Sequence, residues 1–440
     1  MSGGFSRPLA AHGECIAVLG AGPAGVMAAL GLHRLGYPVQ VISQWRRFDA
    51  IEGVSARVMQ ALAQQGLTHT LSMAVPAAER EVHWGEAPVV RNREFLIDRP
   101  QFDAALRADL AAGSVPLREA RVRQLHRLDA GWDIELDDGS RIAASRIVDA
   151  RGRQAPQSGA AQRGPETVSL LCRWRATPGA AASAVERRDD GWTWLARLPD
   201  GTCYWQWVTG AQLPGRAELP AWCAAARQAS ALARRFFPED PGAAVTVHAR
   251  SSTSTLSEEG FDGRLLRVGD AAMAVDPLSG NGIFQSLSSA LQAPAVLHTL
   301  IRDPSREALA LDFHRERVRH LFLRFARMGR DFYRQAPAVG SFWPPRQQWP
   351  DEAPLHYDPD PSQLRVAERP VLEHGEVVAR QVVVTADQPL GVWHVDGVAL
   401  APLVAALPQQ SLRQVLTEQV PQASWQAVGQ WFLSQGVPLD

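Results

Sequence analysis

Two glycine-bearing segments of this chain have the residue types and spacing that bind phosphate-containing ligands. The first is GAGPAG, with glycines at positions 20, 22 and 25. In this spacing Gly20 permits a tight turn, Gly22 lets the backbone approach a pyrophosphate, and Gly25 lets a helix pack on a strand. The N-terminus of that helix then faces the phosphates. The segment predicts a dinucleotide-binding turn; the alternative is a glycine-rich turn without a ligand.

The second segment, GDAAMAVDPLSGNG, spans residues 269–282 and follows a short apolar run. A carboxylate at the end of a strand, here Asp270, can accept hydrogen bonds from a polyol chain. Gly280 and Gly282 can present bare backbone N–H groups at a helix start. The phosphates are already assigned to the first segment. A second segment with polar groups for the same ligand therefore indicates a dinucleotide that also contains a ribityl chain. We therefore predict FAD rather than NAD; the alternative for Asp270 is a helix N-cap.

One position departs from the usual dinucleotide-binding pattern. An acidic residue is expected at the end of the second strand, about 20 residues after the turn, where it holds the ribose hydroxyls. This chain has Ser43 there, and a hydroxyl binds a ribose less strongly than a carboxylate does. Arg47 can offset part of the loss by reaching phosphate, although a solvated surface arginine is an equal alternative. We therefore expect a modest dinucleotide affinity.

Hydrophobic periodicity predicts the elements that position these residues. Residues 14–19 form an apolar run typical of a buried parallel strand, residues 26–35 have helical spacing, and residues 38–42 indicate a second strand. The glycines of the first segment thus lie at the strand-to-helix turn of a βαβ unit. The stretch 121–147 is expected to form a β-meander with a turn at Asp138-Gly139.

The remainder of the chain also has a readable pattern. We expect strands at 168–175, 192–198 and 202–209, a helix over 221–237, and a long arginine-rich helix over 305–335. A stretch rich in Pro, Asp and Gln at 343–362 has the composition of a linker. The last part is expected to contain strands around 371–385 and 391–395 and helices at 398–407, 411–419 and 423–435.

These elements predict an α/β fold: an FAD-binding Rossmann-like domain of the glutathione-reductase type, interleaved with a β-sheet substrate domain and followed by a small C-terminal α/β module. The expected domains are a discontinuous FAD-binding domain at 1–80, 95–165 and 255–300, a substrate domain at 81–94 and 166–254, a helical segment at 301–345, a linker at 346–363, and the module at 364–440.

Composition limits the classes of function. The 440 residues include 45 basic and 46 acidic side chains, for a net charge of -1, so neither nucleic acid nor an anionic membrane is expected as the main partner. No secretory signal or membrane span is visible, and we expect a cytoplasmic protein. The four cysteines lack metal-binding spacing, so no metal is expected. Every one of the 45 basic residues is arginine, which excludes a lysine Schiff base or a lysine general acid.

Four motifs together resemble the single-component flavoprotein monooxygenases and the flavin-dependent halogenases. They are GAGPAG, DRPQFDAAL at 98–106, VDARGR at 148–153, and GDAA followed by DPLSGNG. The resemblance covers roughly residues 14–345. It implies FAD, with NADH or NADPH as a transient reductant, and a C4a-hydroperoxide of the reduced flavin that transfers oxygen to an electron-rich aromatic ring.

The resemblance also implies roles for individual residues. Arg99 matches the arginine that contacts FAD, with an ordinary ion pair as its alternative, and Asp270 matches the aspartate that binds the ribityl chain. Pro277, Gly280 and Gly282 match the loop beside the isoalloxazine ring. The full set of candidate cofactor-binding residues is Gly20, Gly22, Ala24, Gly25, Ser43, Arg47, Arg99, Val122, Asp270, Pro277, Gly280 and Gly282.

The catalytic residues remain unassigned at this stage. His83, His126 and His248 are candidates by residue type only, and each has a structural role as its alternative. The halogenases use a lysine to guide hypohalous acid, and this chain has none, so halogenation is not expected. Trp192 and Trp194 are similar to the halogenase tryptophan motif with altered spacing, and a packed strand face is their alternative.

The element FYR at 332–334 and the segment FWPPR at 342–346 extend the resemblance to flavoproteins that mature tryptophylquinone enzymes. These act on a tryptophan in the small subunit of quinohemoprotein amine dehydrogenase. The resemblance implies a peptide-embedded indole as substrate, O2 as co-substrate, and a docking surface for which the module from 364 is a candidate. The alternatives are a monooxygenase for a small aromatic metabolite, a saturating reductase, and a flavin-binding scaffold.

Overall fold

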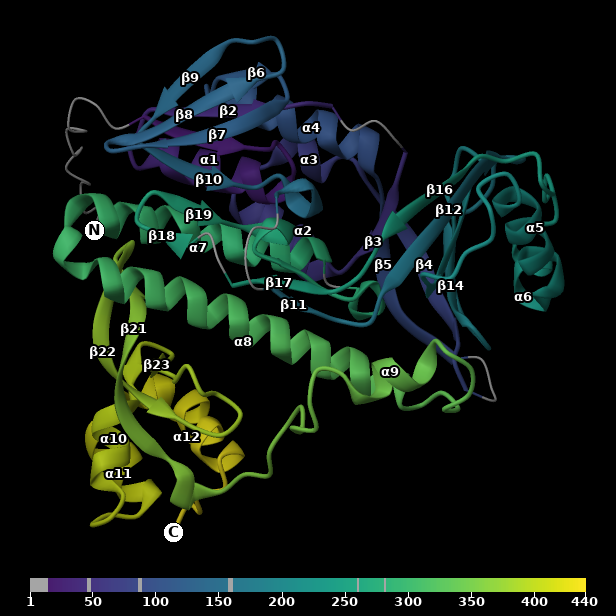
Figure 1. Cartoon of the computed structure of the whole chain (residues 1–440). Helices are drawn as coiled ribbons and strands as arrows, with labels where there is room; N and C mark the ends of the chain where they lie inside the picture. Colours follow the sequence, from purple (N-terminus) through teal and green to yellow (C-terminus); the bar gives the residue numbers. More distant parts are fainter. Residues whose placement is uncertain (1–14, 46–48, 86–88, 157–160, 259–260, 281) are drawn as a thin grey trace. The chain divides into compact units, whose positions relative to one another are not determined.

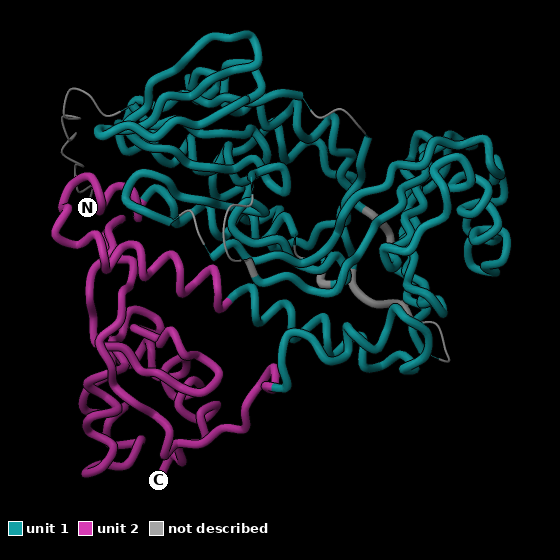
Figure 2. The backbone as a smooth tube through the Cα atoms, in the orientation of Figure 1, with its two compact units in different colours: residues 1–294, 321–352 teal, residues 295–320, 353–440 magenta. Residues whose placement is uncertain are grey.

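The structure is a computed structural model that describes residues 15–45, 49–85, 89–156, 161–258, 261–280 and 282–440 (Figure 1). The chain forms two compact units (Figure 2). Unit 1 comprises residues 1–294 and 321–352, and unit 2 comprises residues 295–320 and 353–440. The candidate cofactor-binding residues that the structure describes all lie in unit 1, whereas residues 295–300 of the expected FAD-binding domain and the module from 364 lie in unit 2.

The βαβ unit expected near the N-terminus is confirmed. Strand β1 (Ile16–Leu19) pairs in parallel with β2 (Val39–Ser43), and helix α1 (Pro23–Arg34) connects them. All four residues of β1 are buried, which explains why the strand is an uninterrupted apolar run. Pro23 begins α1, where its missing N–H costs no hydrogen bond.

A six-stranded sheet carries the glycine-rich turn. Its order is β18-β19-β10-β1-β2-β6. The strands beyond the βαβ unit are β6 (Leu117–Glu119), β10 (Arg146–Asp149), β18 (Phe261–Asp262) and β19 (Leu265–Arg267). All except β18 run in parallel. Their carboxyl ends therefore lie at one edge of the sheet, the edge at which ligands of such sheets bind.

The expected meander forms, but it ends at Ala144 and does not reach residue 147. Strands β7 (Val122–Leu128), β8 (Gly131–Leu136) and β9 (Arg141–Ala144) make a three-stranded antiparallel sheet. The next strand, β10, instead pairs in parallel with β1 and β19. Alternation of apolar residues indicates that a segment is a strand, but it does not reveal a partner that lies far away in the sequence.

A larger, mostly antiparallel sheet of eight strands has the order β16-β12-β15-β14-β13-β4-β5-β3. The strands are β3 (Ile51–Val54), β4 (Ala74–His83), β5 (Val89–Asp98), β12 (Thr167–Arg175), β13 (Ala182–Arg188), β14 (Gly191–Arg197), β15 (Thr202–Gly210) and β16 (Val247–Ser251). The strands expected at 168–175, 192–198 and 202–209 are confirmed. The domain boundary expected after residue 80 falls within β4.

A small sheet, β11-β17-β20, has strands Ala161–Arg163, Thr255–Ser257 and Met273–Ala274.

Two helices replace the single helix expected over 221–237. Helix α5 (Leu219–Ala229) ends where Ser230 takes an extended backbone, and α6 (Ala231–Phe236) begins directly after it. The Ser230 hydroxyl accepts a hydrogen bond from the Ala233 N–H at 2.9 Å, so this serine caps the second helix. The other helices with residues in unit 1 are α2 (Ala56–Gln64), α3 (Thr68–Leu71), α4 (Arg99–Ala112), α7 (Gly282–Arg302), α8 (Glu307–Tyr333) and α9 (Trp343–Gln348).

Unit 2 has its own apolar core. It contains the hairpin β21 (Arg365–Glu373) and β22 (Glu376–Val384), the pair β23 (His394–Val395) and β24 (Val398–Ala399), and helices α10 (Leu400–Ala406), α11 (Leu412–Gln419) and α12 (Trp425–Ser434). Fully buried Val383, Leu400, Val415 and Phe432 form the centre of this core. The three predicted helices are confirmed within a few residues, but the first begins at Leu400 because Val398–Ala399 form β24, and the hairpin begins earlier than predicted, at Arg365.

Candidate cofactor site

The glycine-rich turn fits a pyrophosphate closely. Gly20 has φ +106°, and a Cβ placed on it would lie 2.4 Å from the Ala150 carbonyl oxygen. A Cβ on Gly25 would lie 1.8 Å from the Gly20 carbonyl oxygen. A Cβ on Gly22, in contrast, would meet no atom within 4 Å, and no side-chain hydrogen bond caps α1 at this residue. Gly20 and Gly25 are therefore required by packing, and Gly22 leaves the helix N-terminus open to an anion.

The second glycine-bearing segment meets this turn at the same sheet edge. Gly269 follows β19 with φ +60°, and a Cβ on it would lie 2.8 Å from the Ala24 Cβ. This close approach places the next residue, Asp270, beside the start of α1. The Ser286 hydroxyl lies 3.4 Å from Asp270 Oδ1, and the Arg153 guanidinium lies 3.5 Å from Oδ2. The two segments therefore form one site.

The Asp270 carboxylate is partly exposed although much of its surroundings is protein. About 33% of its side chain is exposed, and burial raises the pKa of Asp270 while Arg153 opposes the shift. An acceptor of this kind can take hydrogen bonds from ligand hydroxyls once the ligand displaces water. These features fit the ribityl chain of FAD.

Arg99 is the first residue of α4 and is only 6% exposed. Its guanidinium donates to Glu52 and, at 2.9 Å and 3.2 Å, to Asp103 Oδ1. Burial alone would lower the pKa of Arg99, but the two carboxylates outweigh it and raise that pKa. The arginine is therefore charged and fixed in place, and these ion pairs are the alternative that the sequence left open for it beside a cofactor contact.

Sequence reasoning missed two members of this charged group, Glu52 and Arg153. Arg153 donates hydrogen bonds to the Thr253 carbonyl at 2.5 Å and the Val275 carbonyl at 3.2 Å, besides its ion pair with Asp270. It therefore ties the VDARGR segment to the segment after β19. The arginines of VDARGR were visible in the sequence, but nothing local indicated their partners.

Hydrogen bonds to the Asp276 side chain hold the loop that follows Asp270 in place. Asp276 Oδ1 accepts hydrogen bonds from the Leu278 N–H at 2.9 Å and from the Tyr333 hydroxyl at 2.8 Å. Burial raises the pKa of Asp276. Pro277 continues the loop, and Gly280 closes it with φ +61°, where a Cβ would meet no atom within 4 Å. The loop is thus held in shape while its tip at Gly280 stays accessible.

The eight-stranded sheet presents an aromatic face to this loop. Leu278 packs against a buried cluster that includes Trp192 and Trp194. Trp192 donates to the Tyr333 hydroxyl at 3.4 Å, and Trp194 donates to the buried carboxylate of Glu94 at 3.2 Å. Both tryptophans are therefore packed and hydrogen-bonded on the strand face, the alternative weighed for them from sequence.

The remaining candidates are spread more widely. Ala24 and Gly282 lie in the first turns of α1 and α7. Ser43 ends β2 and donates to the Gln44 carbonyl at 3.2 Å. Val122 begins β7 and packs against the apolar cluster between the meander and the parallel sheet. Arg47 lies outside the described residues.

The three histidines are not brought together. His83 Nε2 lies 2.6 Å from Glu81, and His126 Nε2 lies 3.4 Å from Glu135, so both are paired with carboxylates. His248 lies on the edge strand β16. Among the described residues, no cluster of His, Cys, Asp and Glu is placed to hold a metal ion, and no helix is both long and apolar enough to cross a bilayer.

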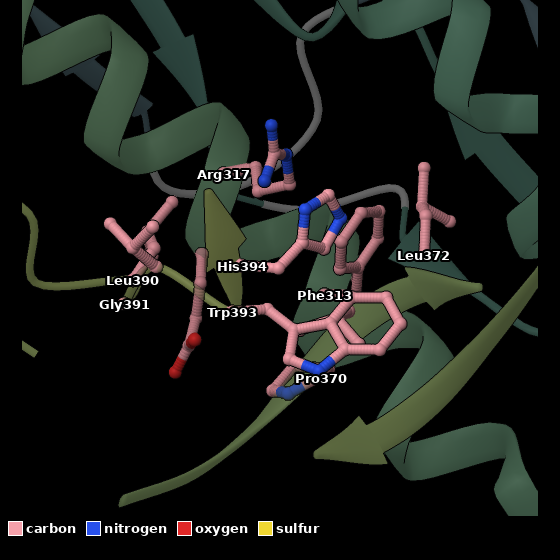
Figure 3. A pocket seen from close by; sticks show the side chains of 11 residues that line it. Phe313, Arg317, Pro370, Leu372, Leu390, Gly391, Trp393 and His394 are labelled. Carbon is pink, nitrogen blue, oxygen red and sulfur yellow. The ribbon is translucent and has the colours of Figure 1, made fainter. Parts of the chain in front are cut away.

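Unit 2 contains a separate cavity of about 310 Å³ (Figure 3). It lies among α8, β21 and the loop before β23, and Phe313, Pro370, Leu372, Trp393 and His394 line it together with Arg317. None of the candidate cofactor-binding residues lines this cavity, so it is distinct from the candidate cofactor site.

The chain is similar to solved structures of flavin-dependent enzymes, whereas no protein-family model and no curated protein matches it. The peptidyl tryptophan dihydroxylase QhpG, essential for tryptophylquinone cofactor biogenesis, is 54% identical over 96% of this chain and 99% of its own, with a TM-score of 0.88. The flavin-dependent halogenase CmlS is 16% identical over 96% and 95%, with a TM-score of 0.75.

More distant structures share the fold alone. A variant of HpxO from Klebsiella pneumoniae, solved with FAD, is 18% identical over 71% of this chain and 88% of that one, with a TM-score of 0.55. Its identity is too low to carry residue roles.

Proposed function

The chain belongs to the flavin-dependent monooxygenase family that includes the peptidyl tryptophan dihydroxylase, and from this relationship we propose that it hydroxylates a tryptophan side chain within a polypeptide. The observation that carries the proposal is the 54% identity over 96% of the chain. The open backbone at Gly22 and the partly exposed Asp270 carboxylate, which fit the phosphates and hydroxyls of FAD, support it. The substrate we propose is the crosslinked small subunit of a quinohemoprotein amine dehydrogenase, during maturation of its tryptophylquinone.

The bound FAD would supply the oxygen chemistry, with NADH or NADPH as reductant and O2 as oxidant. The turn at Gly20–Gly25 would hold the pyrophosphate against the N-terminus of α1, and Asp270 would accept hydrogen bonds from the ribityl hydroxyls. Arg99 would add a fixed positive charge at the same edge. Each hydroxylation inserts one oxygen atom of O2 into a ring C–H bond and releases the other as water, using two electrons from the nicotinamide.

The aromatic face of the eight-stranded sheet would help keep water from the reacting centre. Trp192, Tyr333 and Leu278 belong to one apolar cluster, and the hydroxyl of Tyr333 is already committed to Asp276. A face of this kind favours an indole ring over water beside the Pro277–Gly280 loop. All four cysteines are free thiols, and we propose that the reaction takes place in the cytoplasm, before export of the subunit.

The experiment that tests the function combines turnover with mass analysis. Protein reconstituted with FAD is given NADH or NADPH and O2, with and without the crosslinked small subunit. We expect subunit-stimulated nicotinamide oxidation and O2 uptake, together with a gain of oxygen atoms at a tryptophan of the subunit. Ready hydroxylation of free tryptophan or a small phenol, with the subunit unchanged, would contradict the proposal.

A variant pair separates an enzyme from a flavin-binding scaffold. Asp270→Ala removes the ribityl acceptor, whereas Asp262→Asn removes a partly exposed carboxylate that pairs with Arg127. We expect the first variant to bind the subunit but to leave its mass unchanged, and the second to behave like the wild type. A full yield of oxidised subunit from Asp270→Ala would count against the proposed role of the site.

A further inference from the structure

The end of β2 lacks the carboxylate that usually binds the ribose of a dinucleotide. Ser43 occupies that position, and its hydroxyl donates to the Gln44 carbonyl at 3.2 Å. The hydrogen of this hydroxyl is therefore used within the protein. If nothing else served the ribose, this chain would hold FAD weakly.

The neighbouring strand places a carboxylate beside Ser43. Strand β6 pairs in parallel with β2, and the register puts Glu119 directly opposite Ser43. Both strands end at the edge that carries the glycine-rich turn. Paired residues of neighbouring strands project to the same side of a sheet, so Glu119 lies where a longer side chain can reach the space beside Ser43. Its side chain is 60% exposed.

The Glu119 carboxylate is held across the end of β2. Its Oε2 accepts a hydrogen bond from the Trp45 indole N–H at 2.9 Å. The Arg107 guanidinium lies 3.8 Å from the same oxygen. Arg107 also stacks on the Trp45 ring, 3.5 Å from its centroid, and donates to the Gln44 carbonyl at 2.9 Å. Arg107 on α4 and Trp45 in the segment after β2 thus fix the orientation of this carboxylate.

In the part of the chain that the structure describes, both contacts of Glu119 fall on Oε2. Oε1 can therefore accept hydrogen bonds from a ligand. We propose that Glu119 supplies the carboxylate for the ribose hydroxyls of the adenosine half of FAD, in place of the acid missing from β2. The inference rests on FAD as the cofactor of the proposed function, and it predicts an ordinary rather than a modest FAD affinity.

The first test is the dissociation constant of FAD, measured by quenching of flavin fluorescence on the apoprotein. Glu119→Gln keeps the shape and an acceptor for Trp45 but removes the charge. A hydrogen bond to a charged group contributes about 1.5–3 kcal/mol, so we expect FAD binding to weaken roughly 10-fold to 100-fold. Equal affinity of the wild type and Glu119→Gln would overturn the proposal.

Whether FAD affinity falls or rises distinguishes a direct contact between Glu119 and the ribose from a general effect of removing a negative charge. FAD is an anion, so the loss of a nearby negative charge should strengthen its binding through long-range electrostatics. Asp138→Asn is the matched control. Asp138 is exposed, and it pairs with Arg118, which precedes Glu119 on strand β6. We expect this variant to bind FAD as tightly as the wild type or slightly more tightly. A loss of affinity equal to that of Glu119→Gln would overturn the assignment.

The second test changes the ligand instead of the protein. ADP and 2′-deoxy-ADP compete with FAD for the site that binds the adenosine half, and they differ from each other by one ribose hydroxyl. We expect the wild type to prefer ADP and Glu119→Gln to lose most of that preference. An unchanged preference would overturn the proposal. These outcomes require only FAD binding, whereas failure of the proposed function would leave FAD bound and the subunit unoxidised.

Discussion

At the scale of single residues, Gly22 and Gly25 of the glycine-rich turn are needed for different reasons. Gly25 has no room for a side chain, because a Cβ would lie 1.8 Å from the Gly20 carbonyl oxygen. Gly22 has room on every side, and its backbone is extended with φ −79°. Gly25 is therefore required by the packing of the protein itself, whereas Gly22 leaves space for the proposed ligand.

This difference predicts opposite behaviour of two alanine variants. Gly25→Ala should destabilise the apoprotein, because the turn between β1 and α1 must open to admit the methyl group. Gly22→Ala should leave the melting temperature of the apoprotein unchanged and weaken FAD binding. Thermal unfolding without cofactor, followed by FAD titration, checks both. A stable Gly25→Ala protein or a normal FAD affinity in Gly22→Ala would contradict this division.

The sequence predicted these glycines but not their charged neighbours. The spacing of Gly20, Gly22 and Gly25 is a local signal, since all three belong to one turn. Arg153 reaches Asp270, and Glu119 reaches Trp45, only because strands distant in the sequence become neighbours in the parallel sheet. Ser43 was visible as a departure, but a compensating residue on β6 requires the register of two strands.

At the scale of elements, α4 begins at Arg99, a residue of the candidate cofactor site, and is held in place near its other end. Asp109 accepts hydrogen bonds from the backbone N–H groups of His69 and Thr70 at 3.1 and 2.9 Å. Burial alone would raise the pKa of Asp109, but the hydrogen bonds from Thr70 and His69 lower it overall. The ionised carboxylate therefore stabilises the junction of α3 with α4.

This shift gives a pH prediction. A lowered pKa in the folded state means that Asp109 contributes stability at neutral pH and loses it as the pH falls through that pKa. Asp109→Asn should cost about 1–3 kcal/mol at pH 7. The difference in stability from wild type should shrink below pH about 4, the usual range of an aspartate. Urea unfolding at several pH values measures this, and a difference independent of pH would refute it.

The end of α8 is the support for the loop beside the proposed flavin ring. Tyr333→Phe removes the hydrogen bond to Asp276 and leaves the Trp192 indole N–H without its acceptor. We expect a loss of about 1–3 kcal/mol of stability and a larger share of reducing equivalents lost as hydrogen peroxide. The neighbouring Phe332 is 41% exposed, so Phe332→Leu should change neither quantity. Unaltered coupling in Tyr333→Phe would show that the loop does not depend on this bond.

Element types were easier to predict from the sequence than element partners. The long helix α8 and the strands β12, β14 and β15 follow from periodicity, which each segment carries by itself. The predicted meander wrongly included the first two residues of β10, because the partner of that strand, β1, is remote in the sequence. The break at Ser230 had a local signal, since serine is a common helix cap, but the apolar spacing continues across it.

At the scale of the whole molecule, each unit is assembled from separated segments of chain. Unit 2 joins residues 295–320 to residues 353–440. One link between these segments is the hydrogen bond from the buried Val377 N–H to the Thr299 hydroxyl at 2.8 Å. Thr299 in turn donates to the Ala295 carbonyl at 2.9 Å. Unit 2 therefore depends on a helix that begins in unit 1.

Two substitutions at Thr299 test this dependence. Thr299→Val keeps the size of the side chain but leaves the buried Val377 N–H without an acceptor. This loss should lower the free energy of unfolding by about 1–3 kcal/mol. Thr299→Ser keeps the hydroxyl and should cost less. Calorimetric unfolding of both variants checks the order. Equal destabilisation by the two would mean that the methyl group, and not the hydrogen bond, matters.

The strand order of the parallel sheet has a consequence for biosynthesis. Strand β1 is made first, but its neighbour β10 follows only at Arg146–Asp149, and the next strand, β19, only at Leu265–Arg267. A nascent chain on the ribosome therefore carries an open strand edge until more than half of the protein has been translated. Asp270, which follows β19, also emerges late. The two glycine-bearing segments of the candidate cofactor site can therefore meet only after β19 has been made, and a chain that stops earlier leaves this strand edge open to aggregation.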